Sequence, residues 1–214
     1  MHILVALVLA CLLPVSLANA AEPPFVRVRL ETSMGSITVA VDTRRAPKTS
    51  ANFLAYVDDG RLDGTTFYRA ARAKADPKRG FIQGGIDTDA RRMLVPPIVL
   101  EPTDKTGIRH LDGTISMARK VDPNSATGNF SLTVGPAPML DANGSYRGYA
   151  AFGRIVGGMD VVKRILAQPS GGGQGPMRGQ MLLKPVTITR AVRLDGKPGP
   201  TSPIKPWLLY PRKK

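Results

Sequence analysis

Short runs that alternate apolar with polar residues recur along most of this chain, and they limit its fold more than any other feature. A period of two is typical of strands that bury one face and expose the other. The turn Met34-Gly35-Ser36 joins the first two runs into a predicted hairpin. The predicted strands cover residues 25–31, 37–41, 65–69, 81–83, 97–100, 114–118, 130–134, 149–155 and 186–194.

Two amphipathic segments with helical spacing accompany the strands. Pro47 opens the first, at a position where its missing N–H costs no hydrogen bond, and Gly60 ends it. Its predicted buried stripe consists of Ser50, Phe53, Leu54 and Val57. The second covers residues 159–167, and its stripe consists of Met159, Val162, Ile165 and Leu166. Because closure of a sheet removes its exposed edges, this pattern predicts a mainly β fold, a closed antiparallel barrel with a helix over each end.

The first twenty residues have the pattern of an export signal. They contain no charged side chain, carry an apolar run over residues 3–13, and end in the small-x-small cleavage site Ala18-Asn19-Ala20. A lipoprotein anchor at Cys11 is the alternative, although the apolar stretch before Cys11 is short for one. We therefore predict a cleaved signal peptide over residues 1–20 and an exported protein with no transmembrane segment after cleavage.

Cysteine and histidine are scarce in the remainder of the chain. Cys11 is the only cysteine, and removal of residues 1–20 leaves His110 as the only histidine. The remaining 194 of the 214 residues are enough for one domain with a substantial core. Because a disulfide, a thiol nucleophile and a Cys/His metal site all need side chains that this part lacks, we expect neither a metal nor a cofactor.

The net charge of +14 lies entirely outside the first twenty residues. An excess of this size favours contact with nucleic acid, anionic lipid or acidic protein through a screened, non-specific field. For an exported protein we favour a solvated basic surface that touches an anionic envelope, and we expect no specific nucleic-acid site.

The chain changes composition after Leu194. Residues 195–214 are rich in proline and basic residues, and we predict a disordered tail. The alternative is that its one apolar island, Trp207-Leu208-Leu209-Tyr210, packs on the barrel.

Two predicted strands each contain one polar side chain among apolar ones. Arg69 follows Phe67-Tyr68, and Gln83 follows Phe81-Ile82. No nucleophile, metal ligand set or carboxylate pair accompanies them. A guanidinium and an amide beside an apolar pocket suit recognition of a peptide backbone better than its hydrolysis.

These runs, together with Gly113-Thr114-Ile115-Ser116-Met117-Ala118, resemble the cyclophilins, which are peptidyl-prolyl cis/trans isomerases. The resemblance covers residues 25–194, and the motifs occur in the family's order. It implies a closed eight-stranded antiparallel barrel capped by two α-helices, which is the architecture that the strand pattern favours. It also implies a monomer that acts on proline-containing unfolded or extended polypeptides, and the closest likeness is to cyclophilins exported to the bacterial periplasm.

Prolyl isomerisation breaks no bond. The X–Pro amide is held by resonance behind a barrier of roughly 18–20 kcal/mol. An enzyme must stabilise the twisted amide, in which the nitrogen has regained a lone pair, better than either planar state. A fixed arginine donor suits this role because it stays charged at any working pH. Arg69 stands where cyclophilins carry that arginine, and the resemblance implies that it is the catalytic residue.

The same resemblance implies a substrate-binding pocket around Arg69. Its members differ in role, from the apolar wall for the proline ring to backbone partners for an extended peptide. They are Phe81, Ile82, Gln83, Ala118, Arg119, Asn129, Ser131, Met139, Leu140 and Tyr149.

Three features depart from the family's pattern. Residues 70–80 are eleven positions where cyclophilins usually have four, and the basic surplus predicts a loop that protrudes beside the site. Ser131 replaces the aromatic floor of the proline pocket, a loss of about 1.5–3 kcal/mol of apolar contact. Asn129 is one methylene shorter than the family's glutamine.

These departures keep two other functions open. One is a catalytically weak cyclophilin-like module that binds peptides or acts as a chaperone, which Ser131 and the longer loop support. The other is an anion-binding surface protein for which the barrel is only a scaffold.

Overall fold

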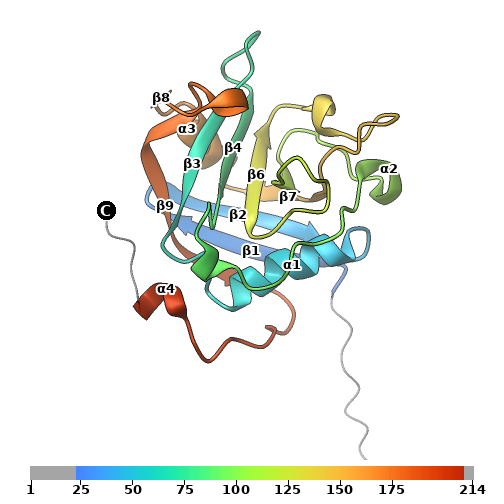
Figure 1. Cartoon of the computed structure of the whole chain (residues 1–214), viewed down its shortest axis with the longest axis vertical. Helices are drawn as coiled ribbons and strands as arrows, with labels where there is room; N and C mark the ends of the chain where they lie inside the picture. The colour runs from blue at the N-terminus through green and yellow to red at the C-terminus, as the bar shows by residue number, and fades with distance from the viewer. Residues whose placement is uncertain (1–22, 210–214) are drawn as a thin grey trace, which may run out of the picture.

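The computed structural model describes residues 23–209, so the predicted signal peptide lies outside the described residues. Pairs of consecutive strands are separated by short helices and turns, and Figure 1 shows how these elements are arranged. The strands are β1 (Phe25–Thr32), β2 (Gly35–Asp42), β3 (Thr65–Arg72), β4 (Gly80–Gly85), β5 (Thr114–Met117), β6 (Asn129–Val134), β7 (Ala151–Gly157), β8 (Ser170–Gly171) and β9 (Met181–Arg193). The helices are α1 (Pro47–Asp58), α2 (Thr103–Thr106), α3 (Met159–Leu166) and α4 (Pro206–Leu209), with the 3-10 turns η1 (Ala90–Arg92), η2 (Pro138–Leu140) and η3 (Gly175–Met177).

The strands form one antiparallel sheet that closes on itself. Their order is β1-β2-β7-β5-β6-β4-β3-β9-β8, and an additional pairing of β1 with β9 closes the barrel. The two-residue β8 is bonded only to β9 and stands outside the closed ring. The predicted eight-stranded barrel with two main helices is therefore confirmed.

The alternating pattern fills the barrel interior with apolar side chains. Val26, Val28 and Leu30 of β1 have no exposed surface, whereas the residues between them face outward. From α1, Phe53 lies with its ring centroid 5.4 Å from those of Phe130 and Phe152, so this helix closes one end of the core.

The second main helix closes the other end. Val162 and Ile165 of α3 are fully buried, as their helical spacing predicts. The helix starts after Gly158, which has φ +78°, and a Cβ there would lie 2.2 Å from the Ser36 carbonyl oxygen. Only glycine allows the chain to enter α3 so close to β2.

Some predicted strand limits were wrong. Residues 97–100 form no strand and contribute one isolated bridge, Ile98 to Ala126, because Pro96 and Pro97 offer no N–H to a ladder. Strand β9 begins at Met181 rather than at Val186, and β7 begins at Ala151 rather than at residue 149.

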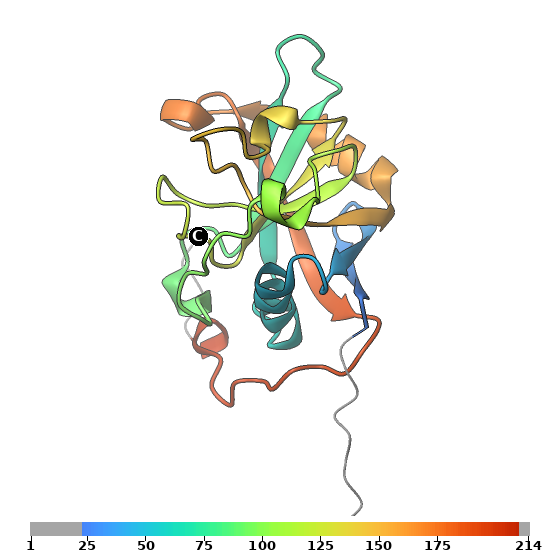
Figure 2. The ribbon, with the colours of Figure 1, turned by 90° about the vertical axis from the view of Figure 1, so that its right-hand side faces the viewer.

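The insertion lengthens the hairpin and ends in the protruding loop that the sequence predicts. Strand β3 continues to Arg72 and β4 starts at Gly80, so only residues 73–79 form the connection, which projects from the barrel in Figure 2. The Arg72 guanidinium donates to the carbonyl oxygens of Leu166 (2.8 Å) and Gln168, and to Ser170 Oγ (3.1 Å). The hairpin is thereby tied to the C-terminal end of α3.

The chain after β9 packs on the barrel, which corrects the predicted disordered tail as far as residue 209. Trp207 in α4 is only 4% exposed, and its ring lies under the guanidinium groups of Arg61 (4.7 Å) and Arg92 (5.5 Å). Asp59 pairs with Arg61 at 2.6 Å and accepts the backbone N–H of Ser202. Among residues 23–209, no helix has the length and apolar character needed to cross a membrane.

Candidate active site

A β-bulge in β3 puts two consecutive polar side chains on the outer face of the barrel. Phe67 pairs with Gly84 and Arg69 with Gln83, so Tyr68 is an extra residue on β3. Phe67 is fully buried in the core, while Tyr68 and Arg69 both reach Gln83. A regular strand would have sent Tyr68 and Arg69 to opposite faces.

Three hydrogen bonds hold the Arg69 guanidinium. Its Nη1 donates to Gln83 Oε1 (2.9 Å), and its Nε and Nη2 donate to Gln180 Oε1 (2.9 and 2.7 Å). The Phe81 ring lies 5.1 Å from the guanidinium carbon. Burial lowers the pKa of Arg69, yet an arginine keeps its charge at any working pH. The planar fork of N–H groups on the Arg69 guanidinium is thus a charged donor in a fixed orientation.

Hydrogen bonds extend from Gln83 to β6. Gln83 Nε2 donates to the Tyr68 hydroxyl (2.8 Å), which donates to Asn129 Oδ1 (3.3 Å). Asn129 in turn bonds the backbone of Asp87 through both atoms of its amide. Burial raises the pKa of Tyr68 to about 12, so its hydroxyl keeps its proton and remains a donor.

The floor beside Gln83 is polar. Ser131 stands opposite Gln83 on one side and Ser116 on the other, so the three side chains share a face. Ser131 is 8% exposed, and its hydroxyl lies 3.5 Å from the Ser116 carbonyl oxygen. This register places Ser131 beside Gln83, and its role as the floor of a proline pocket stays a prediction.

A buried histidine supports the floor from below. His110 Nε2 lies 2.8 Å from Ser116 Oγ, and His110 Nδ1 lies 2.6 Å from Asp141 Oδ1. Burial lowers the pKa of His110, while Asp141 acts in the opposite direction. These groups have the order of a Ser-His-Asp relay, but Ser116 is only 1% exposed, so its hydroxyl is closed to a substrate carbonyl.

Four of the predicted pocket residues lie in two loops outside the strands. Met139 in η2 is 69% exposed, while Leu140 beside it and Tyr149 are partly buried and joined by a backbone bond of 2.9 Å from Tyr149 N to Leu140 O. The Arg119 guanidinium lies 4.6 Å from the centroid of the Tyr149 ring and donates to the Gly148 carbonyl oxygen (2.9 Å). Arg119 thus ties its own loop to the loop that carries Tyr149.

One predicted pocket residue needs correction, and another keeps part of its predicted role. Ile82 has no exposed surface and belongs to the barrel core, because strand alternation turns it away from Phe81 and Gln83. It cannot form the wall for a proline ring. The Ala118 N–H already donates to the Asn129 carbonyl oxygen (2.9 Å), so only the Ala118 carbonyl is left to pair with a peptide.

The structure adds two residues that sequence reasoning missed, Tyr68 and Gln180. Tyr68 stands next to Arg69 in the sequence, but an unbroken alternation would have placed it on the other face. Gln180 lies 111 residues from Arg69 and precedes β9, where no local pattern marks it. Within the described residues, no group of three or more His, Cys, Asp or Glu is arranged to hold a metal ion.

Comparison with known proteins fits this geometry. The family model described as cyclophilin type peptidyl-prolyl cis-trans isomerase matches residues 27–193. The chain belongs to this family. Its relatives include peptidyl-prolyl cis-trans isomerase A of Dickeya dadantii, 35% identical over 86% of this chain and 95% of the relative. Peptidyl-prolyl cis-trans isomerase B of Escherichia coli is 30% identical over 76% of this chain and 99% of the relative.

Solved structures share the fold of this cyclophilin. A crystal structure of a cyclophilin-type isomerase of Cryptosporidium parvum, determined in the presence of the dipeptide Ala-Pro, has a TM-score of 0.63. It is 20% identical, and the match covers 79% of this chain and 99% of that one. By its family the chain is a peptidyl-prolyl cis-trans isomerase.

Proposed function

We propose that this cyclophilin catalyses cis/trans exchange at X–Pro bonds of unfolded or extended exported polypeptides, with Arg69 as the catalytic donor. The observation that carries the proposal is the held guanidinium on the outer face of β3. An arginine has five N–H donors, and three of them are committed to Gln83 and Gln180. The two that remain have fixed directions and can donate to a substrate.

The reaction needs a donor that favours the twisted amide over both planar states. As the X–Pro bond rotates, its nitrogen becomes pyramidal and regains a lone pair that can accept from Arg69. The fork is oriented before substrate arrives, so little reorganisation is required during rotation. Phe81 offers an apolar face beside the guanidinium, and the Gln83 amide can contact the peptide backbone.

An assay of X–Pro exchange on the chain from Ala21 onward tests this activity. Line-shape or exchange NMR on a short peptide measures the rate directly, and we expect catalysis to survive chelators and thiol reagents. Exchange at the uncatalysed rate, together with measurable peptide binding, would favour the alternative of a catalytically weak peptide-binding or chaperone module. The polar floor at Ser131 is the feature that supports that alternative.

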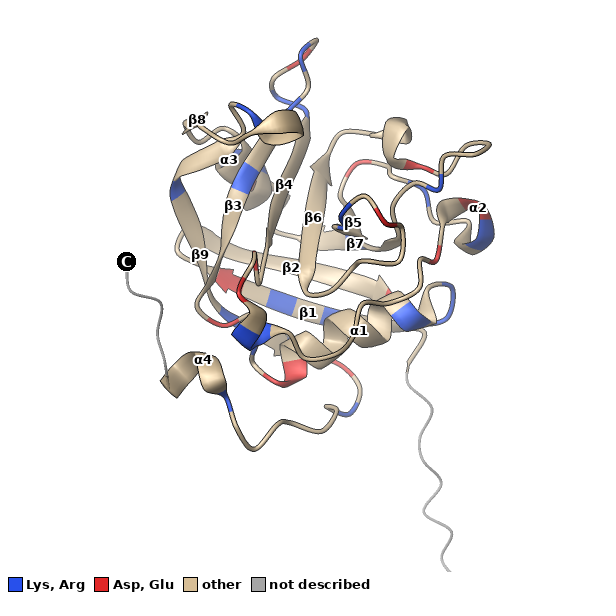
Figure 3. Cartoon of the chain, in the orientation of Figure 1, with Lys and Arg blue, Asp and Glu red and all other residues tan. Residues whose placement is uncertain are grey.

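We further propose that the protein is exported to a bacterial periplasm or secreted, where it acts as a monomer. Support comes from the uncharged apolar start and the Ala18-Asn19-Ala20 site. Amino-terminal sequencing of exported material should find Ala21 first; a lipid-modified Cys11 or an intact Met1 in the membrane fraction would refute this. Figure 3 shows Lys and Arg on elements around the barrel, including β1, β3 and α2, which is compatible with loose contact with an anionic envelope.

A further inference from the structure

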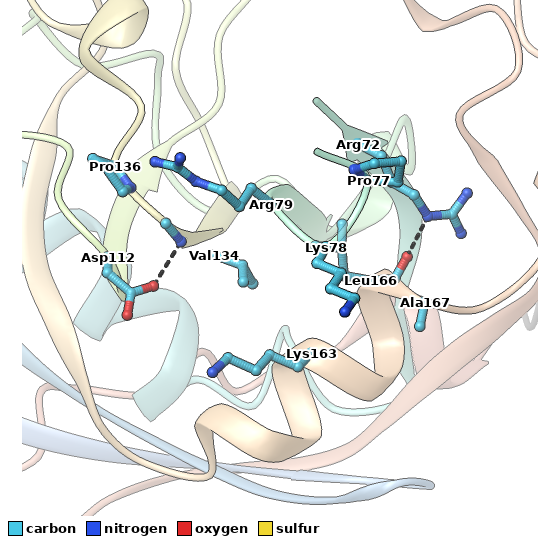
Figure 4. A pocket seen from close by; sticks show the side chains of 11 residues that line it. Arg72, Pro77, Lys78, Arg79, Asp112, Val134, Pro136, Lys163, Leu166 and Ala167 are labelled. Carbon is cyan, nitrogen blue, oxygen red and sulfur yellow. Dashed lines mark hydrogen bonds between the residues drawn. The ribbon is translucent and has the colours of Figure 1, made fainter. Parts of the chain in front are cut away.

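A cavity of about 740 Å³ lies between the inserted hairpin, the segment after β6 and helix α3. Its apolar wall is formed by Pro77, Val134, Pro136, Leu166 and Ala167. The charged residues around it are Arg72, Lys78, Arg79, Lys163 and Asp112, four cations and one acid. Figure 4 shows Lys78 and Lys163 reaching into this space from the hairpin and from α3.

Two of the charged side chains around this cavity have hydrogen-bond partners, and three form no ion pair within residues 23–209. Arg72 is committed to the end of α3, and Asp112 accepts the Gly135 N–H at 2.6 Å. Lys78, Arg79 and Lys163 are exposed, and none of the three forms an ion pair with another residue in the range 23–209.

The Arg79 side chain lies against the backbone of Gly135. A Cβ on Gly135 would lie 2.5 Å from Arg79 Nε, and Gly135 has φ +77°. A side chain at position 135 would therefore be strained and would also displace Arg79. The glycine lets the guanidinium lie directly against the turn that follows β6.

We propose that this cavity binds an acidic, partly apolar segment of the polypeptide substrate, with carboxylates at the three free cations and an apolar side chain against Val134 and Leu166. This inference rests on the proposed function. Gly80 and Val134 form a register pair at the edge of the cavity, and Gln83 lies three residues further along β4. Three strand residues span about 10 Å, so the carboxylates belong three to five residues from the proline.

A peptide segment suits the cavity better than a lipid surface does. The space is concave, open to solvent and bordered by three elements, and its volume holds a few side chains. It also adjoins the strand that carries Phe81 and Gln83, so one extended chain can reach both places.

Two peptides with the same X–Pro core test the proposal. One carries Leu-Glu-Glu three to five residues from the proline, the other carries Leu-Gln-Gln, and each is made with the segment before or after the proline. Fluorescence anisotropy at low salt gives Kd for the intact mature protein. We expect the acidic peptide of one of these arrangements to bind about fivefold to thirtyfold more tightly, as two screened charge contacts would allow.

Charge-matched variants separate a built site from the general positive field. K78Q/R79Q/K163Q should abolish the preference for the acidic peptide, and K163Q alone should reduce it. R44Q/K105Q/R190Q removes three other exposed cations and the same net charge, and it should retain the preference. Both variants should keep wild-type exchange rates on the neutral peptide.

Several results would overturn the proposal. The first is a wild-type protein that binds both peptides equally. The second is a preference for the acidic peptide that survives K78Q/R79Q/K163Q. The third is an equal loss of that preference in both triple variants. Binding to vesicles of anionic phospholipid that depends on the three cations, without peptide discrimination, would also overturn it. Lack of exchange catalysis on the neutral peptide would refute the proposed function instead, since the binding comparison does not depend on turnover.

Discussion

Replacement of Arg69 is the sharpest test of how this cyclophilin works. Arg69→Ala removes the charged fork and leaves Gln83 and Gln180 in place. Loss of one transition-state donor typically lowers the rate about 10²–10³-fold, or about 2.7–4 kcal/mol. We expect kcat/KM for a short X–Pro peptide to fall by about tenfold to a thousandfold.

Two further substitutions separate charge from geometry. Arg69→Lys keeps the charge, but an ammonium on a flexible stem cannot hold both glutamines as the planar fork does. We expect it to lose most of the activity that Arg69→Ala loses. Gln180→Ala keeps the fork and removes two of its three hydrogen bonds, so we expect kcat to fall about threefold to tenfold with KM unchanged, as befits a positioning residue.

The assay must separate catalysis from folding. Exchange NMR on one peptide gives rates for all variants, and thermal unfolding serves as the control. Because the site is partly exposed, loss of the Arg69 bonds should cost about 1 kcal/mol of unfolding free energy, or about 2–4 °C in Tm. Wild-type kcat/KM in a folded Arg69→Ala variant would refute the mechanism, and full activity in Arg69→Lys would refute the importance of the fork.

Three other outcomes follow from the site and the core. Ser131→Phe should raise kcat/KM on simple X–Pro peptides about tenfold by restoring apolar contact under the proline ring, and a folded variant with lower activity in the exchange assay would contradict this. Trp207→Ala should lower the free energy of unfolding in urea by about 2–3 kcal/mol. The control Leu208→Ala, at a position that is 68% exposed, should change it by less than about 0.5 kcal/mol. Equal effects would show that the tail does not pack on the barrel. Burial lowers the pKa of His110, so as the pH falls the histidine of the unfolded chain binds a proton before that of the folded protein. The free energy of unfolding should therefore decline below about pH 6.5, and His110→Gln should remove this decline. A flat wild-type profile in that range would refute the prediction.

The local part of the fold could be predicted from the sequence. Alternation in β1 and β2 and the apolar stripes of α1 and α3 each follow from which side chains one element must bury, so the barrel and its two helices were predictable. Arg69 and Gln83 were predictable as a pair because each is a polar residue in an apolar strand. The same alternation would have excluded Ile82 from the pocket, and the resemblance to the family obscured that.

The arrangement of the site was decided by pairing between distant segments. The bulge that turns Tyr68 toward Gln83 arises where β3 meets β4, and a bulge leaves no periodic trace in one strand. Gln180 reaches Arg69 because β9 pairs with β3, which brings together residues 111 positions apart. Trp207 is buried against Arg61 and Arg92, which come from segments far from it in the chain. The sequence by itself determined most of the elements and which of their faces are buried. The tertiary structure alone decided which polar side chains meet, because those contacts depend on register and closure between segments far apart in the chain.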